Sequence, residues 1–227
     1  MSAATVVSIS LVAAQPHPCA FTVEPVTVDG VLDEAVWREA PPLAFWAPVT
    51  QATPRSRAWA RMAWSSDELF VAFSASDEHL WATRTVRDTD TFRDDCFEVF
   101  VMPREPRFGY HAFETNLLGV THDGLAGAGG ARWDGEGVRF APRTEGTANV
   151  SEDLDTGWAM EVAIPFLSLD ALGSQRPRPG DMWRFNLARR DVDPRWPGGF
   201  DLSCTAPVSV GNFHHWVDWG QMVFTAP

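Results

Sequence analysis

The sequence has 227 residues, of which 45% are hydrophobic and 21% charged, and these proportions are those of an ordinary folded protein rather than a disordered one. Its net charge is −12, because 30 acidic residues stand against 18 basic ones, and all the basic residues are arginine. This balance argues against nucleic acid and anionic membranes as partners, and the lack of lysine excludes Schiff-base chemistry and a Walker-type phosphate loop.

Cysteine usage and hydropathy indicate neither a disulfide framework nor a membrane span. Cys19, Cys96 and Cys204 are odd in number and widely spaced, so we interpret them as small buried side chains, with one disulfide and a free thiol as the alternative. No stretch approaches the roughly 18 apolar residues that a membrane span needs. The apolar residues 1–15 lack a basic start, so we interpret them as a strand rather than a signal peptide.

The first elements along the chain are a short strand and a helical segment. Residues 25–30 alternate in polarity and close with an Asp-Gly pair, which predicts a strand followed by a turn. Residues 33–40 begin with acidic side chains and end before two prolines, which predicts one or two helical turns. Trp37 in this segment is expected to hold it against the core.

Runs of apolar residues then predict a series of strands. A hairpin is expected from residues 57–64 and 69–75, joined by the polar loop 65–68. Two more strands are expected over residues 95–102 and 108–118, the first stopped by Pro103 and the second by Gly119. The glycine-rich residues 124–137 lack the following helix that a phosphate-binding loop requires, so they predict a flexible loop.

The second half of the chain continues this pattern. Further strands are expected over residues 137–142, 147–151, 157–165, 181–190 and 221–225, with a short helical or turn segment over 165–169. Strand alternation sends Trp64, Trp158 and Trp183 to the core. Roughly nine strands with two helical segments predict an all-β, antiparallel β-sandwich with one or two short helices, as a single domain over residues 1–227.

No familiar sequence signature of catalysis occurs, so acidic side chains are the candidates for chemistry. Glu98 lies among apolar residues of its strand, where an ionised side chain needs a partner. That partner is either an arginine or a ligand. With Asp94 or Glu114, Glu98 would form the carboxylate pair of a glycoside hydrolase. Asp94 and Asp95 are interpreted as a solvated turn, although such carboxylates would also suit Ca²⁺.

Two phenylalanines are candidates for ligand contact. Phe92 and Phe213 lie just outside strands, in polar loops of the kind where ligand contacts concentrate on a sandwich. An aromatic ring beside hydrogen-bonding groups suits a sugar, which presents an apolar C–H face and polar hydroxyl edges. Packing of either ring in the core is the alternative.

Several segments occur in an order similar to that of carbohydrate-binding module family 9, which has a broad set of relatives with a DOMON-like sandwich. They are residues 28–37, 61–77, 92–101, 113–119, 158–166, 183–190 and the pairs 213–214 and 219–220, which together extend over residues 24–225. The resemblance implies a jelly-roll-like, DOMON-like sandwich that binds carbohydrate without catalysis. The ligand would be a mono- or oligosaccharide, or the end of a polysaccharide.

The resemblance also implies which residues would hold the sugar. In sugar-binding members a terminal sugar lies between two aromatic rings, and polar residues on adjacent strands bond its hydroxyls. These positions fall on Phe92 and Phe213 for the rings, and on Glu98 and Asn116 for the polar contacts. With a further polar contact and a further loop aromatic, the candidate ligand-binding residues are Phe92, Glu98, Asn116, Arg190, Phe213 and Trp216.

Two departures from the family pattern bear on the ligand. Both ring positions carry Phe in place of the usual Trp, and Glu114 and Ala188 stand where sugar-binding members place polar or basic contacts. The acidic composition favours a neutral rather than an anionic ligand. The resemblance implies no required cofactor, although some family members bind structural Ca²⁺. It implies a secreted or periplasmic protein, whereas the missing basic start leaves a cytoplasmic location open.

A haem-binding, electron-transferring domain of the same sandwich class is the alternative to carbohydrate binding. Such relatives use Met together with His or Lys as axial ligands. Lysine is absent here, so Met62, Met102 or Met160 would have to act with a histidine. A glycoside hydrolase is the other alternative, and the absence of catalytic signatures makes an enzyme the less favoured interpretation.

Overall fold

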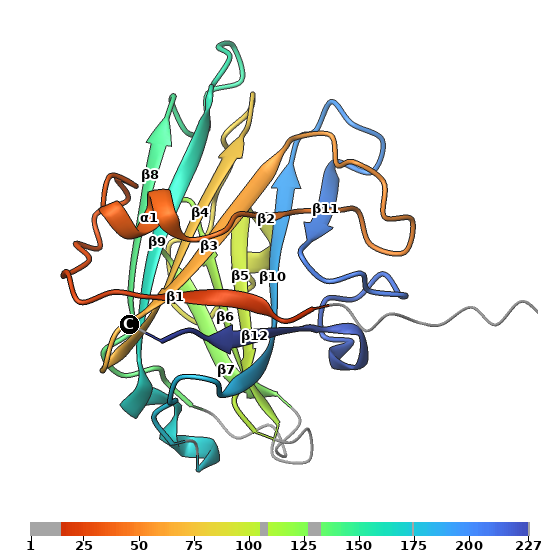
Figure 1. Ribbon diagram of the computed structural model, residues 1–227. Helices are drawn as coiled ribbons and strands as arrows, with labels where there is room; N and C mark the ends of the chain where they lie inside the picture. Colours follow the sequence, from red (N-terminus) through yellow and green to blue (C-terminus); the bar gives the residue numbers. More distant parts are fainter. Residues whose placement is uncertain (1–14, 105–108, 127–132, 174, 227) are drawn as a thin grey trace, which may run out of the picture.

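The computed structural model describes residues 15–104, 109–126, 133–173 and 175–226, which form β-strands with short helical segments between them (Figure 1). The strands are β1 (His17–Phe21), β2 (Leu43–Ala44), β3 (Ala58–Trp64), β4 (Glu68–Ser76), β5 (Cys96–Met102), β6 (Tyr110–Asn116), β7 (Thr121–Ala126), β8 (Arg139–Glu145), β9 (Gly157–Pro165), β10 (Met182–Val192), β11 (Phe200–Cys204) and β12 (Gly220–Phe224). The helical segments include α1 (Ala35–Glu39) and the 3-10 turns η1 (Thr91–Arg93), η3 (Phe166–Leu172) and η4 (Trp216–Asp218). No helix within the described ranges has the length and apolar character to cross a membrane.

The strands form two facing sheets that are joined through β1. In the first sheet the order is β7-β6-β5-β10, and the far edge of β10 pairs with β12 over its first half and with β11 over its second half. In the second sheet the order is β3-β4-β9-β8, with β2 beside β3. Strand β1 pairs in parallel first with β12 and then with β3, so it crosses from one sheet to the other (Figure 1). The other described strand pairings are antiparallel, which confirms the predicted antiparallel β-sandwich.

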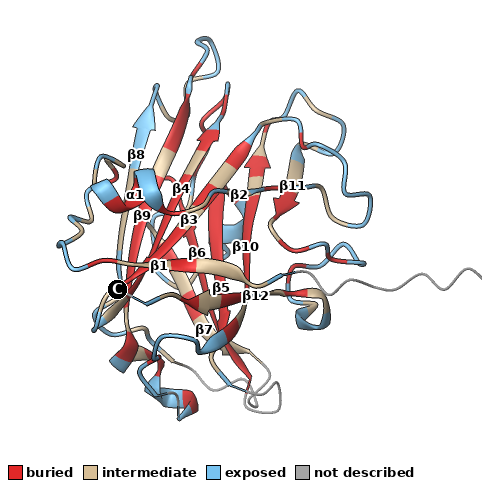
Figure 2. Cartoon of the chain, viewed as in Figure 1, coloured by how far each residue is buried: buried red, intermediate tan, exposed pale blue. Residues whose placement is uncertain are grey.

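The main core lies between the two sheets. The ring of Phe73 on β4 stacks on that of Phe97 on β5 at 4.5 Å, and Phe97 lies 4.2 Å from the ring of Trp158 on β9. Trp64, Trp158 and Trp183 belong to this core, as their strand positions predict. Burial of each such large apolar side chain contributes roughly 1.5–3 kcal/mol. Figure 2 shows the buried residues concentrated along the strands and the exposed ones in the connections.

The outer face of each sheet carries a smaller apolar cluster. On the second sheet, Trp37 of α1 packs against Ala63, Phe70 and Ala72, which confirms that this predicted helical segment is held by its tryptophan. On the first sheet, an outer cluster forms where residues after β11 fold over the strands; its members are Phe100, Met102, Tyr110, Ala112, Ala188, Cys204, Ala206, Val208, Phe213 and Trp219. Because side chains alternate along β5, Glu98 points to the same outer face as Phe100.

Some elements differ from those the sequence predicts. Residues 25–30 form no strand, because the N–H groups of Asp29 and Gly30 bond the Glu161 carboxylate at 3.0 and 2.9 Å instead of a neighbouring strand. Residues 147–151 form none either, whereas β7 and β11 are strands that the glycine-rich and polar sequence did not indicate. Residues 1–14 of the predicted N-terminal strand and 127–132 of the predicted loop lie outside the described residues. The three cysteines are buried and free, as interpreted from their spacing.

Candidate functional site

An open pocket of about 500 Å³ lies on the outer face of the first sheet, next to the outer cluster. Its volume falls within the roughly 300–1,000 Å³ typical of small-ligand sites. The lining brings together Phe92, Glu98, Arg190 and Phe213 from the candidate set. The other lining residues are Glu114, His122, Leu202, Gly211, Asn212 and His214. Strands β5, β6, β7, β10 and β11 and the loop before η4 therefore all contribute to one site.

The polar part of the pocket is a row of cross-strand partners, which we call the carboxylate row. Glu98 on β5 pairs directly with Glu114 on β6, and Glu114 pairs with His122 on β7. On its other side Glu98 pairs with Ala188 of β10, which adds no polar group. Direct partners on one face of a sheet have Cβ atoms roughly 4.5–5.5 Å apart. Two carboxyl groups and an imidazole therefore lie side by side.

Both carboxyl groups of the row are removed from water and lack hydrogen bonds. Glu98 is 4% and Glu114 7% exposed. Among the described residues, none donates a hydrogen bond to either carboxylate, and Oε2 of Glu114 is fully enclosed without a partner. Burial and the neighbouring charge of Glu114 raise the pKa of Glu98 well above its usual value, against the opposing effect of Arg190. Burial also raises the pKa of Glu114, against the opposing effect of His122.

Arg190 is the one arginine in the lining of this pocket. Its guanidinium carbon lies 3.7 Å from the ring centroid of Phe200, a cation–π contact that holds the side chain over β11. Burial, with the neighbouring charge of Arg93, lowers its pKa. Nε of Arg190 is enclosed and has no hydrogen-bond partner in the described part of the chain, so its hydrogen-bonding capacity is unused in this structure.

The two candidate rings differ in exposure. Phe92, within η1, is 37% exposed, and the guanidinium of Arg93 lies 5.5 Å from its ring. Phe213 is only 8% exposed because it packs into the outer cluster. The carbonyl oxygen of Phe213 accepts hydrogen bonds from Nε1 of Trp219 at 2.7 Å and from Nδ2 of Asn186 at 3.4 Å. These bonds fix the loop that carries Phe213 at the rim of the pocket.

Two histidines of the pocket are absent from the candidate set. Nδ1 of His214 lies 2.7 Å from the hydroxyl of Tyr110, and burial lowers the pKa of His214. Nδ1 of His122 is enclosed and lacks a partner among the described residues. The sequence offered one signal for His214, its position beside Phe213, and none for His122, because β7 was not predicted.

Asn116 and Trp216 lie outside the pocket lining. Asn116 is fully buried, and its Nδ2 donates to the carbonyl of Arg84 and to the carboxylate of Asp94, both at 2.9 Å. Its Oδ1 accepts the N–H groups of Leu118 and Val120 at 3.1 and 3.0 Å, which shapes the turn after β6. Trp216 is 37% exposed in η4, shortly after His214.

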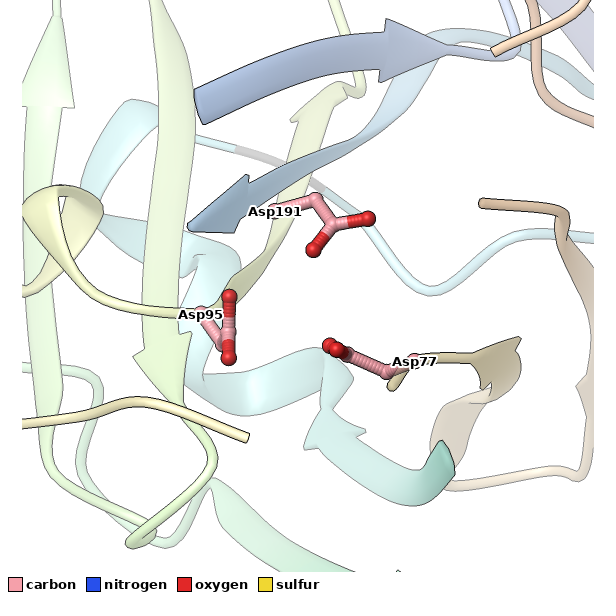
Figure 3. Close-up of side chains that lie close together, drawn as sticks. All are labelled: Asp77, Asp95 and Asp191. Carbon is pink, nitrogen blue, oxygen red and sulfur yellow. The ribbon is translucent and has the colours of Figure 1, made fainter. Parts of the chain in front are cut away.

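A second set of carboxylates, which we call the aspartate cluster, consists of Asp77, Asp95 and Asp191. Their carboxylates converge (Figure 3), with ligand-type oxygens within 4.8 Å of one another. Asp95 is fully buried, and so is Asp94, whose carboxylate pairs with Arg84 at 2.8 Å, so the prediction of a solvated turn at these two residues is wrong. The reason is that both carboxylates accept internal hydrogen bonds.

The aspartate cluster is one of two carboxylate groups in the described residues where the Ca²⁺ implied by the resemblance can be tested, the other being Asp88, Asp123 and Asp134. Nη2 of Arg189, which is fully buried, lies 2.8 Å from Oδ2 of Asp77 and 3.1 Å from Oδ2 of Asp191. Both oxygens of Asp95 accept backbone N–H bonds at 2.6 Å. Calcium takes about six to eight oxygen ligands. A buried guanidinium already lies against two of the carboxylates, and each oxygen of Asp95 accepts a backbone bond, so Ca²⁺ would have to displace Arg189 to gather enough ligands. Only the oxygens of Asp191 lack a hydrogen bond among the described residues, so the cluster fits Ca²⁺ poorly.

The methionines considered for haem ligation are core residues. Met62 and Met160 are 1% and 0% exposed and pack between the sheets, and Met102, 1% exposed, packs in the outer cluster. Their thioethers therefore contribute to apolar packing.

The fold and the pocket together define a β-sandwich domain with a ligand-sized site on the outer face of one sheet. The chain belongs to the family described as carbohydrate family 9 binding domain-like, whose profile matches residues 28–223. This confirms the resemblance to carbohydrate-binding module family 9. No protein of curated function matches the sequence.

Solved structures with the same fold have little sequence identity to this chain. A protein from Bacteroides uniformis, described as a candidate carbohydrate-binding protein, superposes with a TM-score of 0.70 at 15% identity, covering 92% of this chain and 99% of the other. A family 9 module from Caldicellulosiruptor kristjanssonii solved with cellotriose gives 0.64 at 13% identity, covering 93% and 94%. A family 9 module from the same organism solved with glucose gives 0.63 at 15% identity, covering 94% and 97%.

Proposed function

We propose that this protein binds carbohydrate without catalysis and holds a mono- or oligosaccharide, or the end of a polysaccharide, in the pocket beside Phe92 and Phe213. The observation that carries the proposal is the combination of an exposed aromatic ring with enclosed, unpaired polar atoms of Glu114, His122 and Arg190 around one pocket. Membership of the family and the neighbours solved with cellotriose and glucose support it.

The lining residues provide two kinds of contact to a sugar, apolar and hydrogen-bonding. The exposed ring of Phe92 offers an apolar surface to the C–H face of a sugar, and the small exposed part of Phe213 adds to the apolar lining. Carboxyl oxygens of Glu98 and Nε of Arg190 are the partners for hydroxyl groups. An enclosed polar group without a partner costs roughly 1–3 kcal/mol, so a hydroxyl that reaches these atoms recovers that cost.

The two candidates outside the lining act differently in this proposal. Asn116 is a positioning residue, because its bond to Asp94 fixes the chain immediately after η1, which carries Phe92. Trp216, exposed in η4 beyond His214, extends the apolar surface for the second or third unit of an oligosaccharide.

Isothermal titration calorimetry with glucose, xylose, cellotriose and a panel of other sugars tests the proposal. We expect saturable binding of at least one sugar, and loss of that binding in Phe92→Ala with an unchanged melting temperature. Trp59→Ala is the control, since Trp59 lies on β3 of the second sheet, stacked on Arg61 at 4.4 Å. Absence of heat with every sugar up to millimolar concentration would contradict the proposal, and so would equal losses in the two variants.

A glycoside hydrolase is the second candidate, because Glu98 and Glu114 are adjacent carboxyl groups and burial raises the pKa of both, as a catalytic acid requires. Asp94 is the less suitable partner, since Arg84 and Asn116 occupy its carboxylate. Release of reducing sugar from polysaccharides by the native chain, and its loss in Glu98→Gln, would favour this candidate over simple binding.

A further inference from the structure

The carboxylate row leaves negative charge in the pocket that no side chain neutralises by contact. The charged residues of the lining are Glu98, Glu114 and Arg190, with two carboxylates against one guanidinium. The guanidinium stacks on Phe200 at 3.7 Å, and no ion pair within 4.0 Å joins Arg190 to either glutamate among the described residues. The cationic candidates beside Glu114 are His214, whose Nε2 is 4.0 Å from Oε1 of Glu114, and His122, the cross-strand partner of Glu114.

Burial makes this arrangement costly when the pocket is empty. Oε2 of Glu114 is enclosed without a hydrogen bond, and its side chain is 9% exposed. An uncompensated buried carboxylate is strongly unfavourable, so the pocket either holds a proton or is completed by a cation from a ligand. Two adjacent carboxylates accept the bonds of an ammonium group, which has three N–H donors and no acceptor.

Two aromatic rings line the same pocket as the two glutamates. Phe92 and Phe213 line the same pocket, and the face of Phe92 already lies 5.5 Å from the guanidinium of Arg93. Aromatic faces attract cations, most strongly where the site is shielded from water. The net charge of −12 also favours the approach of cations over anions.

We propose that the pocket selects a sugar that carries a free amine, with the ammonium group bound between Glu98 and Glu114 and the sugar ring against Phe92. This inference rests on the proposed carbohydrate binding and narrows its ligand to amino sugars such as glucosamine and its oligosaccharides. An N-acetylated sugar has the same ring but lacks the positive charge, so it is discriminated against by the loss of the charge-assisted bonds.

Binding of an ammonium group is coupled to proton release. Burial raises the pKa of both glutamates and so favours their protonated forms in the empty pocket, whereas a bound cation favours the ionised forms. The other titratable or charged groups around Glu114 are His122 on β7, Asp90 before η1, His214 in the loop and Tyr110 on β6, with Arg190 beside Glu98. For one proton released, affinity rises by at most about tenfold per pH unit while the glutamates titrate.

Calorimetric titration of the native chain with glucosamine, N-acetylglucosamine, glucose and the matching oligosaccharides tests the inference. We expect the amine to bind about tenfold or more tightly than its N-acetylated and neutral counterparts. In two buffers of different ionisation enthalpy, the observed binding enthalpies should differ by the heat of protonating each buffer with the released protons. In Glu114→Gln, the affinity for the amine divided by the affinity for the neutral sugar should fall to about one. Glutamine has nearly the same shape as glutamate, so we expect the fold of this variant to be unchanged.

The control is Glu68→Gln, because Glu68 lies on β4 of the second sheet and pairs with Arg139 at 2.8 Å, so this variant should keep the full preference. Binding of neutral sugars as tight as that of the amine would overturn the inference and leave the proposed function standing. Absence of binding to every sugar would overturn both. An equal loss of preference in the two variants would overturn the inference, because it would show that general charge rather than this pair attracts the amine.

Discussion

The indole N–H of Trp219 donates a 2.7 Å hydrogen bond to the carbonyl oxygen of Phe213, and this bond links the rim of the pocket to the start of β12. Asn186 of β10 supports the same carbonyl at 3.4 Å and accepts the N–H of Ala206 at 3.1 Å through Oδ1. Buried polar side chains that would never touch a sugar therefore set the shape of the site.

Trp219→Phe should weaken sugar binding more than it weakens the fold. The substitution keeps an aromatic ring in the outer cluster but removes the donor, so the carbonyl of Phe213 loses its shorter bond, worth roughly 0.5–1.5 kcal/mol. We expect the dissociation constant measured by calorimetry to rise by about threefold to tenfold. Trp64→Phe is the matched control, since Nε1 of Trp64 donates to the carbonyl of Thr225 at 3.2 Å away from the pocket. It should lower the melting temperature without changing the affinity.

Asn116→Ala should act on stability. Four hydrogen bonds of the Asn116 side chain stay inside the protein, and their loss leaves buried acceptors and donors unpaired. We expect the free energy of unfolding to fall by about 2–4 kcal/mol in urea denaturation. A variant of full stability that has lost sugar affinity would show instead that Asn116 contacts the ligand directly.

The part of the fold that the sequence predicts is the part with regular apolar alternation. Strands β3, β4, β5, β6, β9, β10 and β12 agree with expected segments to within a few residues. Strand β7 was not predicted because glycine and polar residues interrupt it. Strand β11, which pairs with the second half of β10, was not predicted because its own sequence mixes polar and apolar residues. Residues 25–30 misled the prediction because their alternating valines pack against the cluster under α1 rather than in a sheet.

The residues of the site could be predicted from the sequence only where the pattern of a single strand or loop indicates them. Phe92, Glu98, Arg190 and Phe213 meet in the pocket, as a common ligand site would require. The contribution of His122 depends on the register of β6 with β7, which local patterns do not encode. Whether the side-chain amide of Asn116 faces a pocket or a turn depends on its hydrogen-bond partners in the folded chain. The spacing of residues in the sequence does not identify those partners.

Arg189→Met should destabilise the fold in a pH-dependent way. Burial raises the pKa of Asp77 to about 7 and also raises those of Asp95 and Asp191, while Arg189 opposes the rise at Asp77 and Asp191. A carboxyl group with a raised folded-state pKa favours folding below its unfolded value of about 4, and this stability is lost as pH rises toward 7. Without Arg189, the stability lost as pH rises toward 7 is larger. Breaking such a buried pair costs about 3–5 kcal/mol.

Thermal melts of the native chain and of Arg189→Met at pH 5 and pH 8 measure this effect. The gap between the two melting temperatures should be wider at pH 8, which is above the pKa of about 7 of Asp77, than at pH 5. A gap of the same size at both pH values would show that Arg189 acts by packing alone.

Calcium should not raise the melting temperature of the native chain by binding to the aspartate cluster. Arg189 bridges Asp77 and Asp191, so the aspartate cluster already contains its cation. Arg189→Met frees those oxygens, and calcium should then raise the melting temperature of the variant. A clear stabilisation of the native chain by calcium that persists in Asp134→Asn, which removes a ligand of the second carboxylate group, would contradict the conclusion that the aspartate cluster fits the ion poorly.

Gly30→Ala should destabilise the protein more than Gly198→Ala. Both glycines have positive φ, of 83° and 87°, so each substitution carries the strain of a left-handed backbone. A Cβ atom at Gly30 would lie 2.8 Å from Cβ of Arg143 and 2.9 Å from the carbonyl oxygen of Ala141, whereas no atom lies within 4 Å at Gly198. We expect an extra loss of about 1–3 kcal/mol in denaturant unfolding for Gly30→Ala. Equal losses would mean that the contact with β8 relaxes freely.

A crystal structure of the chain with the tightest-binding sugar of the calorimetric panel is the most direct test of the central claim. We expect sugar density in the pocket of the first sheet, with the ring against Phe92 and a polar substituent within hydrogen-bond distance of Glu98 or Glu114. Density at another surface, with the pocket free of sugar at saturating ligand, would contradict it.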